Sequence, residues 1–487
     1  MKKILYILLL AYTLTGCEDF LNQLPEDTLS PDAYYNDTKE LMTGLSGCYK
    51  LLQNIYSPVE MTKVLELMSD DAKDPRNTDV FHVFRKTNAN SQTNIWTHNY
   101  KMIYNCNALL NILATYNGAT ETDRREAQAI EGECHFLRAL AYFNLVRIYG
   151  DVPMVTELFA NPTDAFGIGR TPVNEIYTKV VIPDLENAIA NCYPKGAKEL
   201  IGSEARATKG SALMMLGKVY MTMNNYAEAE KVLQRLIINK EGGEYGLMPT
   251  MHDVFQPENK FNKESIFEVN FNVSGGQACY YFQIMINDIA IRYGTTYNSA
   301  YQAEHNLMRE FVKYNEDVRY KSTLDSGYVP NASPYIQAFP VKFAPEGSMR
   351  AAVKNTGTDN NFMVYRYADA LLMYAECLMK SGNKVEAIKY INMVRNRSEM
   401  ESLPNDHPLD IYWILHERRM ELTFEGHRYF DLVRTGKAIE IISKDLMTVC
   451  DLDDKPTLEP IQEYQLLLPI PTAQIEIDQT LVQNKGY

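Results

Sequence analysis

The sequence predicts a mainly α-helical fold, built from paired helices that form a scaffold, with an irregular, loop-rich lobe that contains short strands. Three observations support this prediction. Apolar residues recur at i, i+3, i+4 and i+7 through most of the chain, which is the period of packed helices. Two stretches repeat the same helix–turn–helix spacing. A third stretch, residues 273–361, is rich in glycine, proline, asparagine and tyrosine and shows little helical period.

The two matching stretches are "ATKGSALMMLGKVYMTMNNYAEAEKVLQRLI" and "YADALLMYAECLMKSGNKVEAIKYINMVRNR". Gly217 and Ala229 are 12 positions apart in the first, and so are Ala375 and Ala387 in the second. Small residues at both positions let two antiparallel helices approach closely, which is the tetratricopeptide arrangement. We expect several such pairs in one scaffold, with a third pair around residues 126–153, ended by Gly150 and Pro153.

Turns and strands are placed by residue type. Asn224–Asn225 and Ser381–Asn383 interrupt the helical period and mark the turns of the two pairs. The stretch "ESIFEVNFN", residues 264–272, alternates apolar and polar positions and predicts a strand. Within the loop-rich lobe, residues 303–314 have the period of a helix. Loops on a rigid frame are where binding residues are commonly found.

The N-terminus has the features of a secretory signal. Lys2 and Lys3 precede an apolar run that is too short to span a bilayer, and "LTGC" ends it at Cys17. This is the pattern of a bacterial lipobox, so residues 1–16 are expected to be removed and Cys17 to carry lipid. The alternative is an ordinary signal peptide cleaved near Gly16. Residues 17–32 are expected to form a lipidated tether.

Composition and charge exclude some classes of partner. Removing the signal takes away two lysines and no acids, so 46 basic and 62 acidic residues give a net charge of −16. Nucleic acid is therefore not an expected partner, because it requires clustered Lys and Arg. Apolar residues make up 46% of the chain, enough to build a sizeable core. The seven cysteines other than Cys17 are scattered, and we expect buried free thiols rather than a disulfide framework.

One series of segments is more specific than any single pattern. At "EGECHFLRALAYFNLVRIYGDVPMVTE" the chain resembles the SusD/RagB family of bacterial outer-membrane nutrient-binding lipoproteins. The other family segments follow in order from end to end: "LTGCEDFL", "VIPDLENAI", "RATKGSALMMLGKVYM", "YRYADALLMYAECLMKSG", "INMVRNRS", "ILHERRMELTFEGHRYFDLVRTGK", "LLLPIPTAQI" and "QNKGY".

The resemblance implies a SusD-like α-α superhelix with an N-terminal helical part at 33–260, a variable lobe at 261–361 and a C-terminal helical part at 362–487. It also implies a lipid-anchored protein on the cell surface, in the outer membrane, that partners a SusC-like TonB-dependent transporter. Family members close the transporter as a hinged lid and present an oligosaccharide, or in some cases a peptide, for import. The acids after Cys17 resemble the family's surface-export tag.

Some residue clusters have the composition of an active site. Glu417, Glu421 and Glu425 share one helical face near Arg418, Arg419 and Arg428. A glycosidase needs two carboxylates that face each other across a cleft, so we interpret this cluster as a structural ion network. Glu131 and Glu133 beside Arg138 are interpreted in the same way. The chain lacks zinc spacing, a nucleophile elbow and a P-loop, so neither catalysis nor a cofactor or metal is expected.

Candidate ligand contacts come from two loops. Sugars are bound by flat aromatic faces and by side chains that pair with vicinal hydroxyls. Residues 69–94 and 279–301 supply both kinds, the second with five tyrosines in 23 residues. The candidates are Asp71, Asp74, Arg76, Asn77, Phe81, Tyr280, Tyr281, Tyr293, Tyr297 and Tyr301. The alternative is that these side chains only pack the lobe.

The two tryptophans, Trp96 and Trp413, occur in helical segments, and we expect both to pack in the core. A stacking platform for sugar would then be built from tyrosines. The leading functional hypothesis is non-catalytic glycan capture for a paired transporter. The alternatives are the same lid role with peptide cargo, a tetratricopeptide-like assembly scaffold without a small ligand, and an enzyme.

Overall fold

The computed structural model describes residues 35–74, 77–159, 162–280, 301–325, 339–343, 359–448 and 456–487. Helices dominate these ranges, and the strands form three short two-stranded sheets. The predicted lipidation site, Cys17, and the tether at 17–32 lie outside the described residues. Within the described ranges, each helix is too short or too polar to cross a bilayer.

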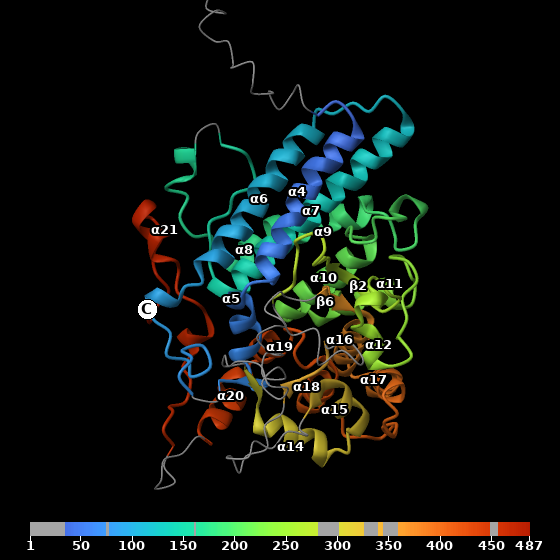
Figure 1. Cartoon of the computed structure of the whole chain (residues 1–487), viewed down its shortest axis with the longest axis vertical. Helices are drawn as coiled ribbons and strands as arrows, with labels where there is room; N and C mark the ends of the chain where they lie inside the picture. Colours follow the sequence, from blue (N-terminus) through green and yellow to red (C-terminus); the bar gives the residue numbers. More distant parts are fainter. Residues whose placement is uncertain are drawn as a thin grey trace, which may run out of the picture.

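Long helices form the N-terminal part of the frame. These are α4 (Thr38–Tyr56), α6 (Thr93–Leu113), α7 (Glu121–Tyr149) and α9 (Ile182–Asn191). Helices α4, α6 and α7 run side by side in the upper half of Figure 1, and α9 packs against α7. The helix pair expected around residues 126–153 is formed by α7, which contains most of this stretch, and α6, which precedes it. No proline interrupts the chain from Glu121 to Tyr149, so the helix continues to Gly150 and pairs with α6.

The two predicted helix pairs are confirmed. Helix α10 (Lys209–Thr222) packs on α11 (Tyr226–Ile237), and α16 (Tyr367–Lys380) packs on α17 (Lys384–Arg397). The pairs are neighbours, because α11 also packs against α16. A Cβ atom on Gly217 would lie 2.9 Å from Leu233 Cδ2, so the absence of a side chain permits the close approach of α10 and α11.

The turns of these pairs have the same geometry although they are 158 residues apart. Asn225 (φ −91°, ψ 67°) and Asn383 (φ −87°, ψ 63°) are the N-caps of α11 and α17, and each side chain accepts a backbone N–H three residues later. The preceding residues, Asn224 and Gly382, both have left-handed backbone conformations, with φ of 58° and 89°. Asparagine and glycine are the residues that adopt this conformation at least cost.

The predicted strand is present as β2 (Ser265–Val269), which pairs antiparallel with β6 (Phe362–Arg366). All ten residues are buried, including Glu268, because α4, α10 and α16 pack around the sheet. The alternation in the sequence therefore does not separate a core face from a solvent face. Two further pairs are β1 (Ala72–Lys73) with β3 (Gln302–Ala303) and β4 (Leu324–Asp325) with β5 (Phe339–Pro340).

The C-terminal helices lie in the lower half of Figure 1. They are α18 (Ile411–Leu422), α19 (Arg428–Arg434) and α20 (Ala438–Leu446), and α14 (His305–Lys313) confirms the helix expected at 303–314. The remaining elements are α5 (Val59–Thr62), η1 (Lys63–Leu67), η2 (Asn88–Asn90), η3 (Pro162–Ala165), α8 (Val173–Ile176), η4 (Tyr177–Val181), η5 (Lys198–Leu200), α12 (Met251–Val254), η6 (Pro257–Asn259), α15 (Asp317–Thr323), η7 (Glu463–Leu466) and α21 (Thr472–Ile477).

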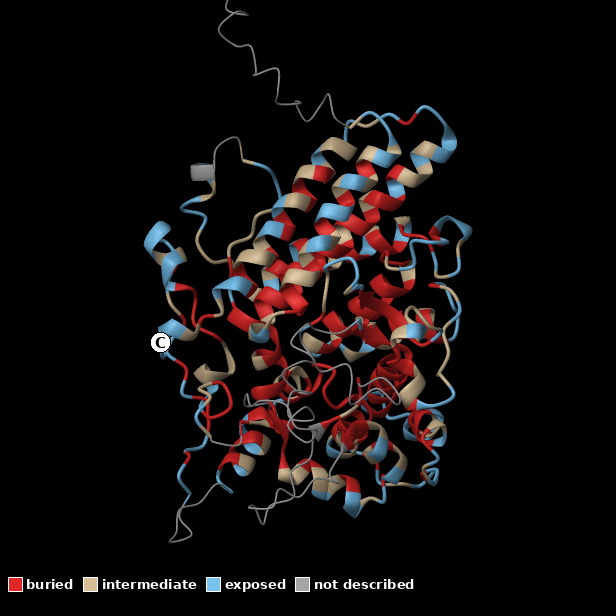
Figure 2. Cartoon of the chain, viewed as in Figure 1, coloured by how far each residue is buried: buried red, intermediate tan, exposed pale blue. Residues whose placement is uncertain are grey.

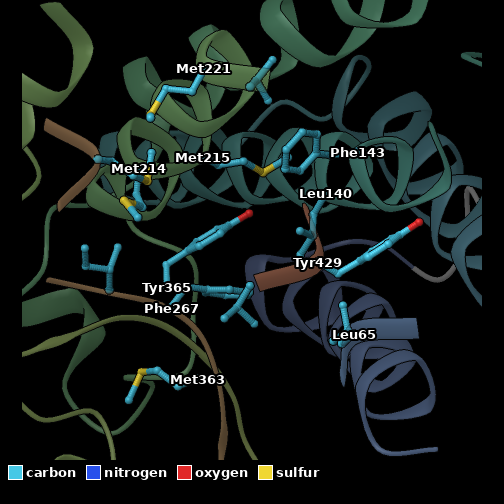
Figure 3. Packing of buried hydrophobic residues seen from close by; sticks show 14 of the residues in the cluster. Leu65, Leu140, Phe143, Met214, Met215, Met221, Phe267, Met363, Tyr365 and Tyr429 are labelled. Atoms are coloured by element: carbon cyan, nitrogen blue, oxygen red, sulfur yellow. The ribbon is translucent and has the colours of Figure 1, made fainter. Parts of the chain in front are cut away.

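One large core runs through the frame. Figure 2 shows buried residues along the lower parts of the long helices and through most of α16 and α18. In Figure 3, Phe143 of α7, Met214 and Met215 of α10, Phe267 of β2 and Tyr365 of β6 meet in this core. Six cysteines, 48, 106, 134, 192, 279 and 377, are buried free thiols as expected. Cys450 lies outside the described residues.

Candidate functional site

A groove at the C-terminal end of α4 carries one of the predicted ligand residues. We call it the α4 groove, and its volume is about 500 Å³. It lies between the end of α4, the start of α5 and residues 271–280, the last described part of the loop-rich lobe before residue 301. Its lining residues are Lys50, Gln53, Asn54, Ser57, Pro58, Val59, Glu60, Phe271, Gly276, Gln277, Ala278 and Tyr280.

Hydrogen bonds fix residues 271–280 to helix α4. The side-chain amide of Gln53 donates to the carbonyl of Asn270 (2.7 Å) and to Gln277 Oε1 (3.1 Å). Ser57 Oγ accepts from the backbone N–H of Tyr280 at 3.1 Å and lies 3.3 Å from the carbonyl of Ala278. The lobe segment is therefore positioned by a rigid helix, which reduces the cost of ordering a binding surface.

The groove presents both donors and acceptors around one exposed ring. Tyr280 is 43% exposed, and Val59 beside the groove is 41% exposed. Lys50 Nζ donates to Gln53 Oε1 at 2.7 Å, and Glu60 Oε1 accepts from Asn94 Nδ2 at 3.0 Å. An aromatic face with amide, ammonium and carboxylate groups nearby is the combination that binds a polyhydroxylated ligand.

The described candidates from residues 69–94 have contacts within the chain. Asp71 is fully buried and its Oδ1 lies 2.7 Å from Arg419 Nε. Asp74 Oδ2 accepts from the hydroxyl and N–H of Thr78. Phe81 is 1% exposed, with Lys63 Nζ 5.5 Å from its ring centre. Asn77 is half-buried, with φ 53°. Their role as ligand contacts stays a prediction.

The predicted tyrosines divide into two sets. Tyr280 lines the α4 groove, whereas Tyr301 is 8% exposed and its hydroxyl lies 3.3 Å from Asp79 Oδ2. Tyr281, Tyr293, Tyr297 and Arg76 lie outside the described residues. The amide side chains of Gln53, Asn54 and Gln277 complete the groove, and sequence reasoning did not select them. Gln53 and Asn54 belong to a regular helix, where polar residues usually face solvent.

The carboxylates of α18 form the buried ion network that the sequence predicts, but with other partners. Glu417 pairs with Arg319 (2.7 Å) and Arg395 (2.8 Å), and Glu421 pairs with Arg366 (2.7 Å) and Arg397. Glu425 pairs with Arg366 and Lys342.

The three arginines of the same segment point elsewhere. Arg418 pairs with Asp369 and Asp431, Arg419 with Asp70 and Asp71, and Arg428 with Asp70. The expected local pairing is therefore wrong, because neighbouring positions on a helix face different sides. For the same reason Glu133 pairs with Arg206 (2.6 Å), while Arg138 pairs with Asp184 (2.7 Å).

Burial opposes ionisation in this network, and the surrounding arginines overcome it. Burial would raise the pKa of Glu421, but the charges of Arg397, Arg366 and Arg319 hold the pKa of that carboxyl far below its usual range. These glutamates are therefore ionised structural groups with fixed partners.

Two tryptophans differ in their surroundings. Trp96 is 4% exposed and packs on Tyr100 and Tyr149, as expected for a core residue. Trp413 is only half-buried: one side packs against the core and it also lines a second hollow beside α18. The expectation that both tryptophans are purely core residues is correct for Trp96 and incomplete for Trp413.

Comparisons with known proteins cover almost the whole chain. The sequence profile of the SusD family matches residues 241–487, a profile described as "Starch-binding associating with outer membrane" matches residues 19–221, and a tetratricopeptide repeat profile matches residues 211–239. SusD-like protein P2 of Formosa agariphila is 24% identical over 521 residues, covering 100% of this chain and 99% of that relative.

Solved structures show the same architecture. A "Laminarin binding SusD-like protein" has 27% sequence identity and a TM-score of 0.75, with 93% of this chain and 100% of that chain covered. The surface glycan-binding protein A from Bacteroides thetaiotaomicron, solved in complex with laminarihexaose, has 21% identity and a TM-score of 0.72, with 92% and 99% covered. The second likeness is one of fold.

Proposed function

The chain belongs to the SusD family, and from this premise we propose that it binds an oligosaccharide or polysaccharide nutrient at the cell surface, without cleaving it, and delivers it to a SusC-like TonB-dependent outer-membrane transporter. One observation carries the proposal. A laminarin-binding SusD-like protein has 27% identity and a TM-score of 0.75 over 93% of this chain. The match covers 100% of that chain.

The α4 groove supports this function chemically. The exposed face of Tyr280 suits the apolar C–H side of a sugar ring, and Asn54, Gln277 and Glu60 suit its hydroxyl groups. A single site of this kind binds with about −4 to −8 kcal/mol, which is millimolar to micromolar, and this range permits release to a transporter. Tyr281, Tyr293 and Tyr297 are proposed as further contacts.

The membrane attachment is a separate part of the proposal. Cys17 would carry the lipid and residues 17–32 would form the tether, in agreement with the profile that describes association with the outer membrane. Cells grown with labelled palmitate should label the protein, and Cys17→Ser should abolish the label. Wild-type protein that carries no palmitate label would contradict the lipid anchor. Failure to co-purify with an outer-membrane barrel would contradict the transporter partnership.

The ligand is tested by isothermal titration calorimetry with laminarin, a panel of unrelated glycans and a mixture of peptides. We expect heat with one or more glycans and about tenfold weaker binding after Tyr280→Ala. Tyr104→Ala is the matched control, because Tyr104 is an exposed helical tyrosine outside the groove. Heat with peptides alone would establish peptide cargo instead. If the protein forms a complex with other proteins but gives no heat with any glycan or peptide, the assembly-scaffold alternative is favoured.

A further inference from the structure

A second hollow lies beside helix α18, and we call it the α18 cleft. Its volume is about 640 Å³, and it is formed by α14, α18, α20 and the loop 407–410 in the lower part of Figure 1. It shares no lining residue with the α4 groove. Its lining residues are Asp70, Asn306, Arg309, Glu310, Tyr314, His407, Pro408, Asp410, Tyr412, Trp413, Leu415, His416, Arg419, Arg428, Glu440, Ile441, Lys444, Asp445 and Thr448.

Aromatic rings form one wall of this cleft. The half-buried indole of Trp413 lies 4.4 Å from the ring centre of His407 and 5.7 Å from that of Tyr314, which meets it edge-on at 86°. The ring centre of His416 lies 4.2 Å from that of Tyr314. Tyr412, one position before Trp413, is 43% exposed. The neighbouring rings fix the orientation of Trp413, so an aromatic surface is already in place for a ligand.

Two polar atoms in this wall have no hydrogen-bond partner among the residues that the structure describes. They are Trp413 Nε1 and His416 Nε2, and the His416 side chain is 9% exposed. Burying a donor or acceptor without a partner costs about 1–3 kcal/mol. Both atoms are covered in this conformation, although both residues line the cleft.

The neighbouring carboxylate indicates what kind of partner is needed. Glu310 Oε2 lies 3.5 Å from His416 Nδ1 and 3.2 Å from Arg419. Burial would raise the pKa of Glu310, but the hydrogen bond with His416 and the charge of Arg419 lower it to about 2. Glu310 is therefore an acceptor, and the His416 imidazole faces it through Nδ1. A hydroxyl group can both donate and accept a hydrogen bond, so it suits a wall that presents indole, imidazole and carboxylate groups together.

The charges of the cleft are nearly balanced. Four basic side chains, Arg309, Arg419, Arg428 and Lys444, face five acidic ones, Asp70, Glu310, Asp410, Glu440 and Asp445. Arg419 and Arg428, on its floor, are already paired with Asp70. A strongly anionic ligand would need uncommitted cations, and a cationic ligand would need an excess of carboxylates. The balance favours a neutral ligand with many hydroxyl groups.

We propose that the α18 cleft is a second saccharide-binding site, which takes a neutral oligosaccharide segment against Trp413 and Tyr412. This inference rests on the proposed function, because it assigns the same ligand class to a second place on the chain. Two separate sites would hold one long glycan at two points, and the second contact would then form at high effective concentration. Long glycans would bind more tightly than short ones of the same linkage.

The chain contains two tryptophans, and Trp96 is buried, so fluorescence can report on the cleft. In Trp96→Phe, Trp413 is the single emitter. We expect laminarihexaose to shift or quench the emission of Trp413. The same change should occur in Tyr280→Ala, and about tenfold more laminarihexaose should be needed to produce it in Tyr412→Ala. Tyr104→Ala should behave as the parent. If Trp96→Phe does not fold, protection of wild-type emission from acrylamide gives the same measurement.

The outcomes separate the two proposals. Glycan binding by calorimetry with no change at Trp413, or a Trp413 signal abolished by Tyr280→Ala, would overturn the second site and leave the proposed function intact. Equal affinity of the parent and Tyr412→Ala in the fluorescence titration would also overturn it. Absence of heat and of any emission change with laminarin, laminarihexaose and the glycan panel would overturn both.

Discussion

Arg366 and Glu421 form a fully buried ion pair, with Arg366 Nη1 2.7 Å from Glu421 Oε1. Arg366 ends strand β6 and Glu421 lies on α18, and the same guanidinium reaches Glu264 and Glu425. One side chain thus joins three segments at the centre of the C-terminal part. Removing one member leaves the other charges buried without compensation.

Arg366→Leu should therefore lower the free energy of unfolding by about 3–5 kcal/mol. The control is Arg235→Leu, because the Arg235–Glu241 pair is more than a third exposed and should change stability by less than about 1 kcal/mol. Urea unfolding followed by circular dichroism measures both. Similar losses for the two variants would contradict the structural role of the buried network.

Gly217→Leu tests the close approach of α10 and α11. A side chain there meets Leu233 in a packed interface, and overpacking of this kind costs about 1–3 kcal/mol. Gly47→Leu makes the same change on the exposed face of α4, where no atom lies within 4 Å of an added Cβ. It should be stabilising by about 0.5–1 kcal/mol, because leucine favours helix more than glycine does. The midpoint of thermal unfolding should fall for Gly217→Leu and rise for Gly47→Leu. Equal shifts of the two midpoints would contradict the prediction.

The turn before α11 should tolerate glycine and reject a β-branched residue. Asn224 has φ 58°, and the equivalent residue of the second pair is Gly382. Asn224→Gly should leave stability nearly unchanged, whereas Asn224→Val should lower the free energy of unfolding by about 1–2 kcal/mol. Denaturant midpoints of the two variants give the comparison. An unaffected valine variant would show that the left-handed turn is not required.

Asp445 should make stability decrease as pH rises towards neutrality. Burial, with the nearby charges of Glu304 and Asp70, raises the pKa of Asp445 to about 7 although Arg419 opposes the shift. Between about pH 4 and pH 7 the folded state therefore holds a proton that the unfolded chain has lost. The contribution of Asp445 to the free energy of unfolding thus falls as pH increases through that window.

Asp445→Asn should flatten this part of the pH dependence. Asparagine keeps an acceptor for Asn306, which donates to Asp445 in the native chain. Urea unfolding at pH 5, 6, 7 and 8 measures the slope of the unfolding free energy for both proteins. Parallel slopes would show that Asp445 does not carry a raised pKa.

Local patterns were sufficient to predict much of the frame. The period of apolar residues, with Gly217 and Ala229 12 positions apart, identified a helix pair because neighbours three or four positions apart share a face. The turn at Asn224 was marked by its residue type. The apolar period around residues 126–153 predicts a third pair, but it does not show that the partner of this helix is α6, at residues 93–113.

The candidate site could be predicted only in part. Tyr280 was selected by the density of tyrosines, and it lines the α4 groove. Gln53 and Asn54 were not selected, because a polar residue on a helix looks the same whether it faces solvent or another segment. Trp413 was assigned to the core, since the sequence cannot show that α14 and α20 leave a hollow beside it.

The sequence by itself determined that this protein is a frame of paired helices with a loop-rich lobe, and that the acids and arginines of α18 and the segment after it belong to a structural ion network. Only the tertiary structure decided which charges pair, such as Arg419 with Asp71 across 348 positions. The reason is physical: helix period and turn type depend on residues a few positions apart, whereas ion pairs and clefts depend on segments that meet only after the chain has folded.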